Sequence, residues 1–292
     1  MLAILISAAA SAACPAMVVS GGPGENHVMF QGLSPDGRSI AVGWDRGTGP
    51  ATERGAYLLD LNTGMRTDLP HLNNAPSFSP DGRFLVSANY AQDRSLRTEV
   101  VELDRRSGKA RTFASGRSAE WLASYSRDGR AILFNSTRSG GSDIYEVDRA
   151  TGALRQLTID PRYEAHASYI DGGRRIVFHR QTAGDNYDII VRDLKTGAER
   201  AVGATALEEA YPAVSPDGRW IAFSAVPAPG KQPNLYVMRR NGSGRVRLTD
   251  GTAKDAYASW SPNGRDLYFV RFEGAESKIL RLSMRGGSCT RR

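Results

Sequence analysis

The most regular feature of the sequence is a short apolar run that recurs about every 45 residues, each time after a polar turn. The first copy has the turn Ser-Pro-Asp-Gly-Arg at residues 34–38 and the apolar run Ile-Ala-Val at residues 40–42. Six copies are present, and their glycines lie 44 to 47 residues apart: Gly37, Gly82, Gly129, Gly173, Gly218 and Gly264. Repetition at a near-constant period indicates one structural unit repeated along the chain.

The residues of the turn explain how each copy ends one strand and begins the next. Proline presets φ for the second turn position, Asp or Asn bonds nearby backbone, and glycine supplies the positive φ that returns the chain to a strand. Each repeat then has a polar loop, a third run such as Asp-Ile-Tyr-Glu-Val at residues 143–147, a glycine turn and a more polar run. Four antiparallel strands per repeat are therefore predicted, which is the composition of a propeller blade.

Six such repeats predict an all-β fold, a six-bladed β-propeller of four-stranded antiparallel blades. The expected blades cover residues 25–70, 71–116, 117–160, 161–206, 207–252 and 253–292. The last repeat lacks a full outer strand, whereas the apolar residues 16–19 have no role in the first repeat. We therefore expect residues 16–19 to pair on the last blade, where they would cover an open sheet edge and close the ring.

The N-terminal residues differ from the repeats. Residues 2–6 are apolar, and a run of Ala and Ser extends to Ala13. This pattern predicts a signal peptide over residues 1–13, with a small-residue cleavage site and export to the periplasm. No Lys or Arg precedes the apolar run, so the α-amino group would supply its only positive charge. The alternative is a disordered apolar N-terminus.

The two cysteines, Cys14 and Cys289, lie near opposite ends of the expected mature chain. A closed ring would bring these ends together, and an oxidising compartment would allow a disulfide between Cys14 and Cys289. A second interpretation is that Cys14 is a lipidated first residue. The large aliphatic residue usual three positions before such a cysteine is missing, since Ser11 stands there.

Composition limits the classes of function. Hydrophobic residues make up 40% of the 292 residues, enough for a core, and no internal apolar stretch approaches the roughly 20 residues that span a bilayer. The formal net charge is +7, but the arginines recur around the ring, mostly beside an Asp, and do not alternate with aromatic residues. The sequence therefore indicates neither a membrane-spanning nor a nucleic-acid-binding protein.

The fifth repeat carries a family resemblance. It reads Trp-Ile-Ala-Phe-Ser at residues 220–224, Asn-Leu-Tyr-Val-Met at 234–238 and Arg-Leu-Thr-Asp at 247–250. Together with Ser-Pro-Asp-Gly-Arg, this pattern resembles the propeller repeat of TolB, the periplasmic member of the Tol–Pal envelope system. The resemblance covers roughly residues 25–292 and implies a partner protein in the cell envelope. TolB also has an N-terminal α/β domain, for which this sequence has no room, so the inner-membrane link of TolB is not implied.

Candidate binding residues emerge when the repeats are aligned on the turn Ser. Six residues before it, the third to sixth repeats hold Glu120, Glu164, Glu209 and Asp255; four residues before it, the fourth to sixth hold His166, Tyr211 and Tyr257. We expect a channel mouth lined by these carboxylates, with His166 and the two tyrosines nearby. Such a site would take a basic peptide, a cation or a polar ligand. In the alternative interpretation, the carboxylates bond backbone amides of neighbouring blades and the tyrosines pack between blades.

No catalytic motif accompanies these residues. A Gly-x-Ser-x-Gly elbow is missing, and the four histidines, His27, His71, His166 and His179, share no register and no metal-binding spacing. We predict no cofactor; a channel cation such as calcium is conceivable, but the sequence specifies no ligands for it. The expected function is a monomeric scaffold that binds a protein or peptide. The alternative is a propeller lyase or hydrolase acting on a carbohydrate or sugar acid through Glu164, Glu209 and Asp255.

Overall fold

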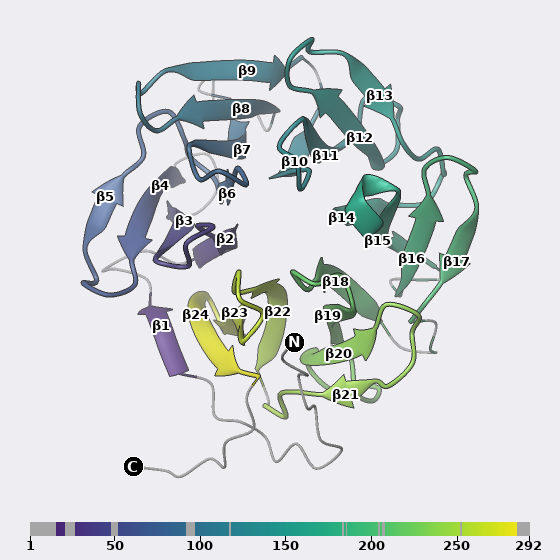
Figure 1. Ribbon diagram of the computed structural model, residues 1–292. Helices are drawn as coiled ribbons and strands as arrows, with labels where there is room; N and C mark the ends of the chain where they lie inside the picture. Colours follow the sequence, from purple (N-terminus) through teal and green to yellow (C-terminus); the bar gives the residue numbers. More distant parts are fainter. Residues whose placement is uncertain are drawn as a thin grey trace.

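The computed structural model is a ring of six four-stranded antiparallel sheets (Figure 1). It describes residues 16–20, 27–47, 52–91, 97–116, 118–182, 184, 186–203, 205, 208–251 and 253–284. The predicted signal peptide and both cysteines of the predicted disulfide, Cys14 and Cys289, lie outside these residues. The six-bladed propeller expected from the repeat is confirmed.

The first three blades follow the chain from the innermost strand outward. Blade 1 has β2 (His27–Leu33), β3 (Ser39–Arg46), β4 (Glu53–Asp60) and β5 (Arg66–Asp68). Blade 2 has β6 (Ser77–Phe78), β7 (Phe84–Tyr90), β8 (Thr98–Asp104) and β9 (Ala110–Ala114). Blade 3 has β10 (Glu120–Tyr125), β11 (Ala131–Ser136), β12 (Asp143–Asp148) and β13 (Leu154–Gln156).

The other three blades complete the ring. Blade 4 has β14 (Glu164–Ile170), β15 (Arg175–Gln181), β16 (Tyr187–Asp193) and β17 (Glu199–Ala201), with a 3-10 turn, η2 (Asp171–Gly173), between its first two strands. Blade 5 has β18 (Glu209–Val214), β19 (Trp220–Ala225), β20 (Asn234–Arg239) and β21 (Val246–Arg247). Blade 6 has β22 (Lys254–Trp260), β23 (Asp266–Glu273), β24 (Glu276–Ser283) and, on its outer edge, β1 (Ala16–Ser20).

The repeated turn is held by its own side chains. In the first copy, Ser34 Oγ donates to Asp36 Oδ1 at 2.5 Å, and the backbone N–H of Arg38 donates to the same oxygen at 3.0 Å. These hydrogen bonds lower the pKa of Asp36. Gly37 has φ of +71°, which an L-residue rarely adopts, and its N–H closes the turn on the carbonyl of Ser34. The Asp is therefore bound within the hairpin tip.

The core lies between neighbouring blades. Phe134, Phe178, Phe223 and Phe269 hold the same place in the second strands of blades 3 to 6, and all are essentially inaccessible to solvent. Blades 4 and 5 share one cluster that includes Val177 and Ile189 from one sheet and Phe223 from the next. Because both faces of each sheet are covered, the second strands are continuous apolar runs.

The first and last blades meet at the seam of the ring. β1 runs antiparallel to β24, with Ala16 opposite Arg281 and Ser20 opposite Lys278. Blades 6 and 1 also share an apolar cluster that contains Val28 and Val270. Ser277 Oγ donates to the carbonyl of Val28 at 3.0 Å and accepts from its N–H at 2.7 Å. Segments that are far apart in the sequence are therefore joined at the seam by the same kinds of contact that join successive blades.

In the part of the chain that the structure describes, no helix is long and apolar enough to cross a membrane.

Candidate functional site

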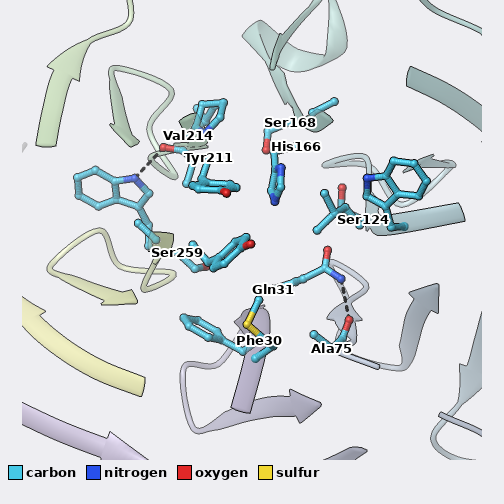
Figure 2. A pocket seen from close by; sticks show the side chains of 18 of the residues that line it. Phe30, Gln31, Ala75, Ser124, His166, Ser168, Tyr211, Val214 and Ser259 are labelled. Carbon is cyan, nitrogen blue, oxygen red and sulfur yellow. Dashed lines mark hydrogen bonds between the residues drawn. The ribbon is translucent and has the colours of Figure 1, made fainter. Parts of the chain in front are cut away.

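A cavity of about 440 Å³ lies on the axis of the ring, where all six blades contribute residues from or beside their innermost strands (Figure 2). Two hydrogen bonds join blades in its wall. Gln31 Nε2 donates to the carbonyl of Ala75 at 2.6 Å, and Trp260 Nε1 donates to that of Ala213 at 3.1 Å. A site built this way has a rigid frame, since most of its lining residues belong to strands rather than to loops.

The described residues that line this cavity are uncharged. Aromatic rings come from Phe30, Trp121, Tyr163, His166, Tyr211, Tyr257 and Trp260, and hydroxyl groups also come from Ser124, Ser168 and Ser259. No Asp, Glu, Lys or Arg is among the described lining residues. The cavity therefore offers apolar and hydrogen-bonding surface without a counter-ion for a charged group.

Four equivalent residues of the innermost strands adopt a left-handed backbone conformation. Leu122, His166, Tyr211 and Tyr257 have φ between 55° and 59°. Each lies where the pairing with the second strand shifts by a bulge, for example between Ala165 and Ser168 in blade 4. A non-glycine residue in this region costs roughly 1 kcal/mol or more. The bulge directs these side chains toward the axis, as Figure 2 shows for His166 and Tyr211.

The aromatic rings of these residues form one contiguous group. The ring centroids of His166 and Tyr211 are 4.6 Å apart, and those of Tyr211 and Tyr257 are 4.4 Å apart. His179 from β15 adds a fourth ring, 4.9 Å from His166. The structure thus brings together three residues that the sequence proposed from one alignment column, His166, Tyr211 and Tyr257.

Hydrogen bonds from the neighbouring blade hold the strained backbone. The N–H of Tyr211 donates to His179 Nδ1 at 3.1 Å, and the N–H of His166 donates to Asn135 Oδ1 at 3.3 Å. His179 and Asn135 occupy equivalent positions in the second strands, with His179 opposite Ala165 and Asn135 opposite Trp121 of the innermost strands. Burial lowers the pKa of His179 to about 3 and that of His166 well below its ordinary value, so both rings are neutral. The two ring nitrogens of His166 are buried without a hydrogen-bond partner.

The four carboxylates of the sequence prediction lie elsewhere. Glu120, Glu164, Glu209 and Asp255 are each 0% exposed and each is ion-paired with an arginine of its own blade, respectively Arg138, Arg180, Arg245 and Arg271. Asp255 has a two-pronged pair, with Arg271 Nε 2.7 Å from Oδ1 and Nη2 2.8 Å from Oδ2. None of the four is among the described residues that line the cavity. The expected carboxylate-lined mouth is therefore not what this geometry shows: the carboxylates are buried in the blades.

Burial affects the pKa of two of these carboxylates, Glu164 and Glu209. Burial raises the pKa of Glu164 and Glu209, while Arg180 and Arg245 oppose that shift. One oxygen of each of Glu120, Glu164 and Glu209 is buried without a hydrogen-bond partner. Their bonds to arginine within the same blade also differ from the alternative in which they bond amides of the next blade.

Sequence reasoning missed most of the cavity wall. Trp121, Tyr163 and Gln31 were not singled out, and neither were the serines two residues before the turn Ser in the third, fourth and sixth repeats. The serine column was visible in the aligned repeats as Ser124, Ser168 and Ser259. The bulge was not visible, because it depends on φ values that the neighbouring blade imposes.

The histidines do not form a metal centre in the described region. His166 and His179 are neighbours, whereas His71 is exposed in the segment between β5 and β6, and the side chain of His27 lies outside the described part. Among the residues that the structure describes, no group of three or more His, Cys, Asp and Glu is arranged to hold a metal ion.

Replacing His179 by Asn is expected to make the protein less sensitive to acid. With a pKa of about 3 in the folded protein against an ordinary 6.5, His179 takes up a proton in the unfolded chain that the folded state does not bind. Its contribution to stability is therefore complete above pH 6.5 and falls by about 1.4 kcal/mol for each pH unit below it, until the pH reaches about 3. Urea unfolding at a series of pH values measures this slope.

The repeat supplies the reason for choosing Asn, since Asn135 already accepts the equivalent backbone hydrogen bond in blade 3. His71→Asn, which changes an exposed histidine, is the matched control and is expected to leave the slope unchanged. An identical acid slope for the wild type and His179→Asn would show that His179 is not the group responsible.

Comparison with known proteins places this geometry in a family. The sequence matches the family described as TolB beta propeller domain over two overlapping segments, residues 23–228 and 185–292. The chain belongs to this family. The resemblance to TolB propellers that the repeats indicated is thereby confirmed.

Individual TolB propellers show how far the similarity extends. The crystal structure of TolB from Acinetobacter baumannii is 27% identical, with a TM-score of 0.65, over 80% of this chain and 57% of that protein. A TolB candidate from Agrobacterium tumefaciens has a TM-score of 0.70 and 19% identity over 88% of this chain and 90% of its own, which shows the shared fold. An uncharacterized protein of Agrobacterium fabrum is 31% identical over 87 residues, 30% of this chain and 29% of its own length. This chain thus spans less than two thirds of the A. baumannii TolB.

Proposed function

We propose that this TolB propeller is exported to the periplasm and binds a peptide segment of a protein partner in its central cavity. The observation that carries the proposal is the uncharged, aromatic lining of a cavity of about 440 Å³. A volume of this size is typical of pockets that enclose a small molecule or a few side chains. Aromatic residues held on rigid strands are the anchors that contribute most to binding energy.

The backbone of the lining residues supports a binding role. His166, Tyr211 and Tyr257 keep left-handed conformations that cost energy, and such strain is concentrated at functional sites in proteins. The equivalent position in blade 1 is Phe30, whose φ is not in the left-handed region, so a blade can form without this conformation. Because a blade can form without the left-handed conformation, we attribute this strain to the cavity whose wall it shapes.

The lining also indicates the chemistry of the bound segment. A charged side chain that entered this cavity would lose its hydration without gaining an ion pair. An apolar, aromatic or neutral polar segment would instead bury apolar surface against the rings and bond the hydroxyls of Ser124, Ser168 and Ser259. The proposed ligand is therefore an uncharged stretch of a protein, in place of the basic peptide expected from sequence.

Binding is favoured over carbohydrate cleavage by the state of the carboxylates. A glycoside-cleaving site needs two carboxyl groups that face the substrate. Glu164, Glu209 and Asp255 are buried and bound to Arg180, Arg245 and Arg271, and all three arginines lie in their own blades. These residues support blade structure rather than chemistry at the cavity.

The test replaces Tyr211 and Tyr257 by Leu and measures capture of partners from a bacterial envelope extract. Leu122 occupies the same left-handed position in blade 3, so the double variant is expected to fold. Loss of two aromatic anchors should weaken capture by about 30-fold or more, as for binding hot spots of 2 kcal/mol. Quantitative pull-down at a series of bait concentrations measures the change.

The matched control is the double variant Tyr90→Leu/Trp220→Leu, which removes one ring from β7 of blade 2 and one from β19 of blade 5, both outside the cavity. This control should retain capture. Retention of every partner by Tyr211→Leu/Tyr257→Leu, with both variants folded by circular dichroism, would refute binding in the cavity.

A further inference from the structure

A cluster of exposed cationic side chains lies on the turns and the outer strand of blades 2 and 3, which are neighbours in the ring (Figure 1). We name it the blade 2–3 basic surface and define it by six exposed cationic residues: Arg105, Arg106, Lys109, Arg111, Arg127 and Arg130. Arg130 belongs to the repeated hairpin tip, and arginine recurs at the positions of Arg105 and Arg111 in other blades, as Arg149 and Arg155. Arg106, Lys109 and Arg127 are the departures from the repeat. The described residues of this surface lie outside the central cavity.

The turn between the third and fourth strands of blade 2 departs from the other blades. The turns of blades 1, 3 and 4 begin at Asp60, Asp148 and Asp193, and each has its glycine N–H bonded to the carbonyl of that Asp, as Gly108 is to Asp104 in blade 2. At the position of Arg106 these turns hold Asn62, Ala150 and Lys195; at the position of Lys109 they hold Met65, Ala153 and Ala198. The same backbone therefore forms without Arg106 and Lys109.

The hairpin tip of blade 3 departs from the repeat next to this turn. Arg127 stands where the tips of blades 1, 2, 5 and 6 hold Pro35, Pro80, Pro216 and Pro262. Ser126 Oγ still donates to Asp128 Oδ1, at 2.7 Å, as in the proline-containing tips. Proline would preset this turn, so the fold gains nothing from an arginine there. A role outside the fold accounts better for Arg127.

The two departures are adjacent in space. Gly129 of the blade 3 tip is so close to blade 2 that a Cβ there would lie 3.4 Å from Cδ of Pro80. Arg105 Nη1 donates to the carbonyl of Gly82 at 2.7 Å, and Arg111 Nη1 donates to that of Arg149 at 2.9 Å. Arg111 thus extends from β9 of blade 2 to the turn of blade 3.

Aromatic rings orient two of these guanidinium groups. The guanidinium carbon of Arg111 lies 4.3 Å from the ring centre of Phe113, and that of Arg105 lies 5.5 Å from the ring centre of Phe78. A guanidinium that is stacked on a ring has lost part of its conformational freedom before it meets a ligand, and its N–H groups suit the two oxygens of a carboxylate. The surface is therefore partly organised for anions.

A groove of about 420 Å³ continues the surface between the tips of blades 3 and 4. Its lining includes Arg127 and Arg130 together with Tyr169 and two acidic residues, Asp128 and Glu146. Asp128 accepts the N–H of Arg130, and Glu146 is paired with Arg155. The negative charges among these arginines repel the closely spaced anionic groups of a bilayer surface. A peptide with acidic residues spaced along it can instead place each carboxylate beside a cationic side chain.

We infer that the blade 2–3 basic surface docks an acidic segment of a protein partner, with its carboxylates on Arg106, Lys109, Arg111 and Arg127. This inference is independent of binding in the central cavity. The repeat provides the test variant Arg106→Asn/Lys109→Ala/Arg127→Pro, in which every new residue already stands at the equivalent position of another blade. The control Lys195→Asn/Lys231→Ser/Arg281→Ser removes the same charge from exposed or partly exposed places in blades 4, 5 and 6.

The experiment measures fluorescence anisotropy of a labelled peptide of alternating Glu and Ser, titrated at low salt with the full chain and both variants. The test variant should bind about tenfold more weakly, because three exposed ion pairs are lost, whereas the control should change by about twofold or less. Equal weakening in the two variants would show attraction by net charge alone and overturn the inference. Binding to phosphatidylglycerol vesicles in preference to the peptide would overturn it as well.

Discussion

Replacing Arg271 by Ala should lower the free energy of unfolding by about 3 kcal/mol or more, because it leaves a buried charge without its partner. Asp255 is 0% exposed and receives two hydrogen bonds from the Arg271 guanidinium across the strands β22 and β23. An uncompensated carboxylate in that place must either stay ionised in a poorly hydrated environment or take up a proton. Urea unfolding of the wild type and the variant near neutral pH measures the difference.

Two further variants test whether the loss of stability comes from the unpaired buried charge of Asp255. Blade 1 has Val28 at the position of Asp255 and pairs it with Trp44, so a blade tolerates an apolar pair there. Asp255→Val/Arg271→Leu should therefore recover much of the loss. The exposed pair of Lys278 and Glu273 is the control, and Lys278→Ala should cost about 1 kcal/mol or less. If Arg271→Ala is no more harmful than Lys278→Ala, the burial argument fails.

Removal of β1 should destabilise the ring by about 4 kcal/mol, since four of its residues pair with β24 and each backbone hydrogen bond contributes about 1 kcal/mol net. For a domain of this size such a loss lowers the melting temperature by roughly 10 °C. The exposed edge of β24 should also promote association between chains. Calorimetry and light scattering of a chain that starts at residue 21 measure the two effects.

The matched control starts at residue 16 and keeps β1 (Ala16–Ser20). Its melting temperature should lie close to that of the longer chain and well above that of the chain starting at residue 21. Equal melting temperatures for the two truncated chains would show that the ring is held without β1. Binding assays on the same pair would then report whether the geometry of the cavity depends on ring closure.

Comparison of the six repeats within this one chain separates residues that serve the fold from residues that are free for another role. A column of aligned positions that serves the blade keeps its chemistry: three residues after each turn glycine stands a fully buried Ile or Leu, from Ile40 in blade 1 to Leu267 in blade 6. Where one blade has a different residue at an aligned position and its backbone conformation stays the same, that residue is free for another role. Tyr211 and Tyr257 depart from Leu122 in this way, and Arg127 departs from four prolines. The two proposals concern opposite chemistries, an uncharged cavity and a cationic surface, and can therefore be tested one at a time.

Six evenly spaced turns were enough to predict the number of blades, their strands and the propeller, because turn chemistry and apolar runs act locally and the ring repeats them. They also identified His166, Tyr211 and Tyr257 as one column, which the structure brings together on the axis. The same alignment placed four carboxylates at the channel mouth, but the local sequence pattern could not predict that they are buried within the blades. Their arginines come from different positions of the repeat: Arg180 and Arg271 lie opposite the carboxylate, Arg138 follows the second strand, and Arg245 precedes the fourth. These ion pairs form only when the strands of a blade are assembled, and burial and the left-handed conformation of the axis residues depend on packing against the next blade. Only the folded ring could therefore separate the buried carboxylates from the open cavity.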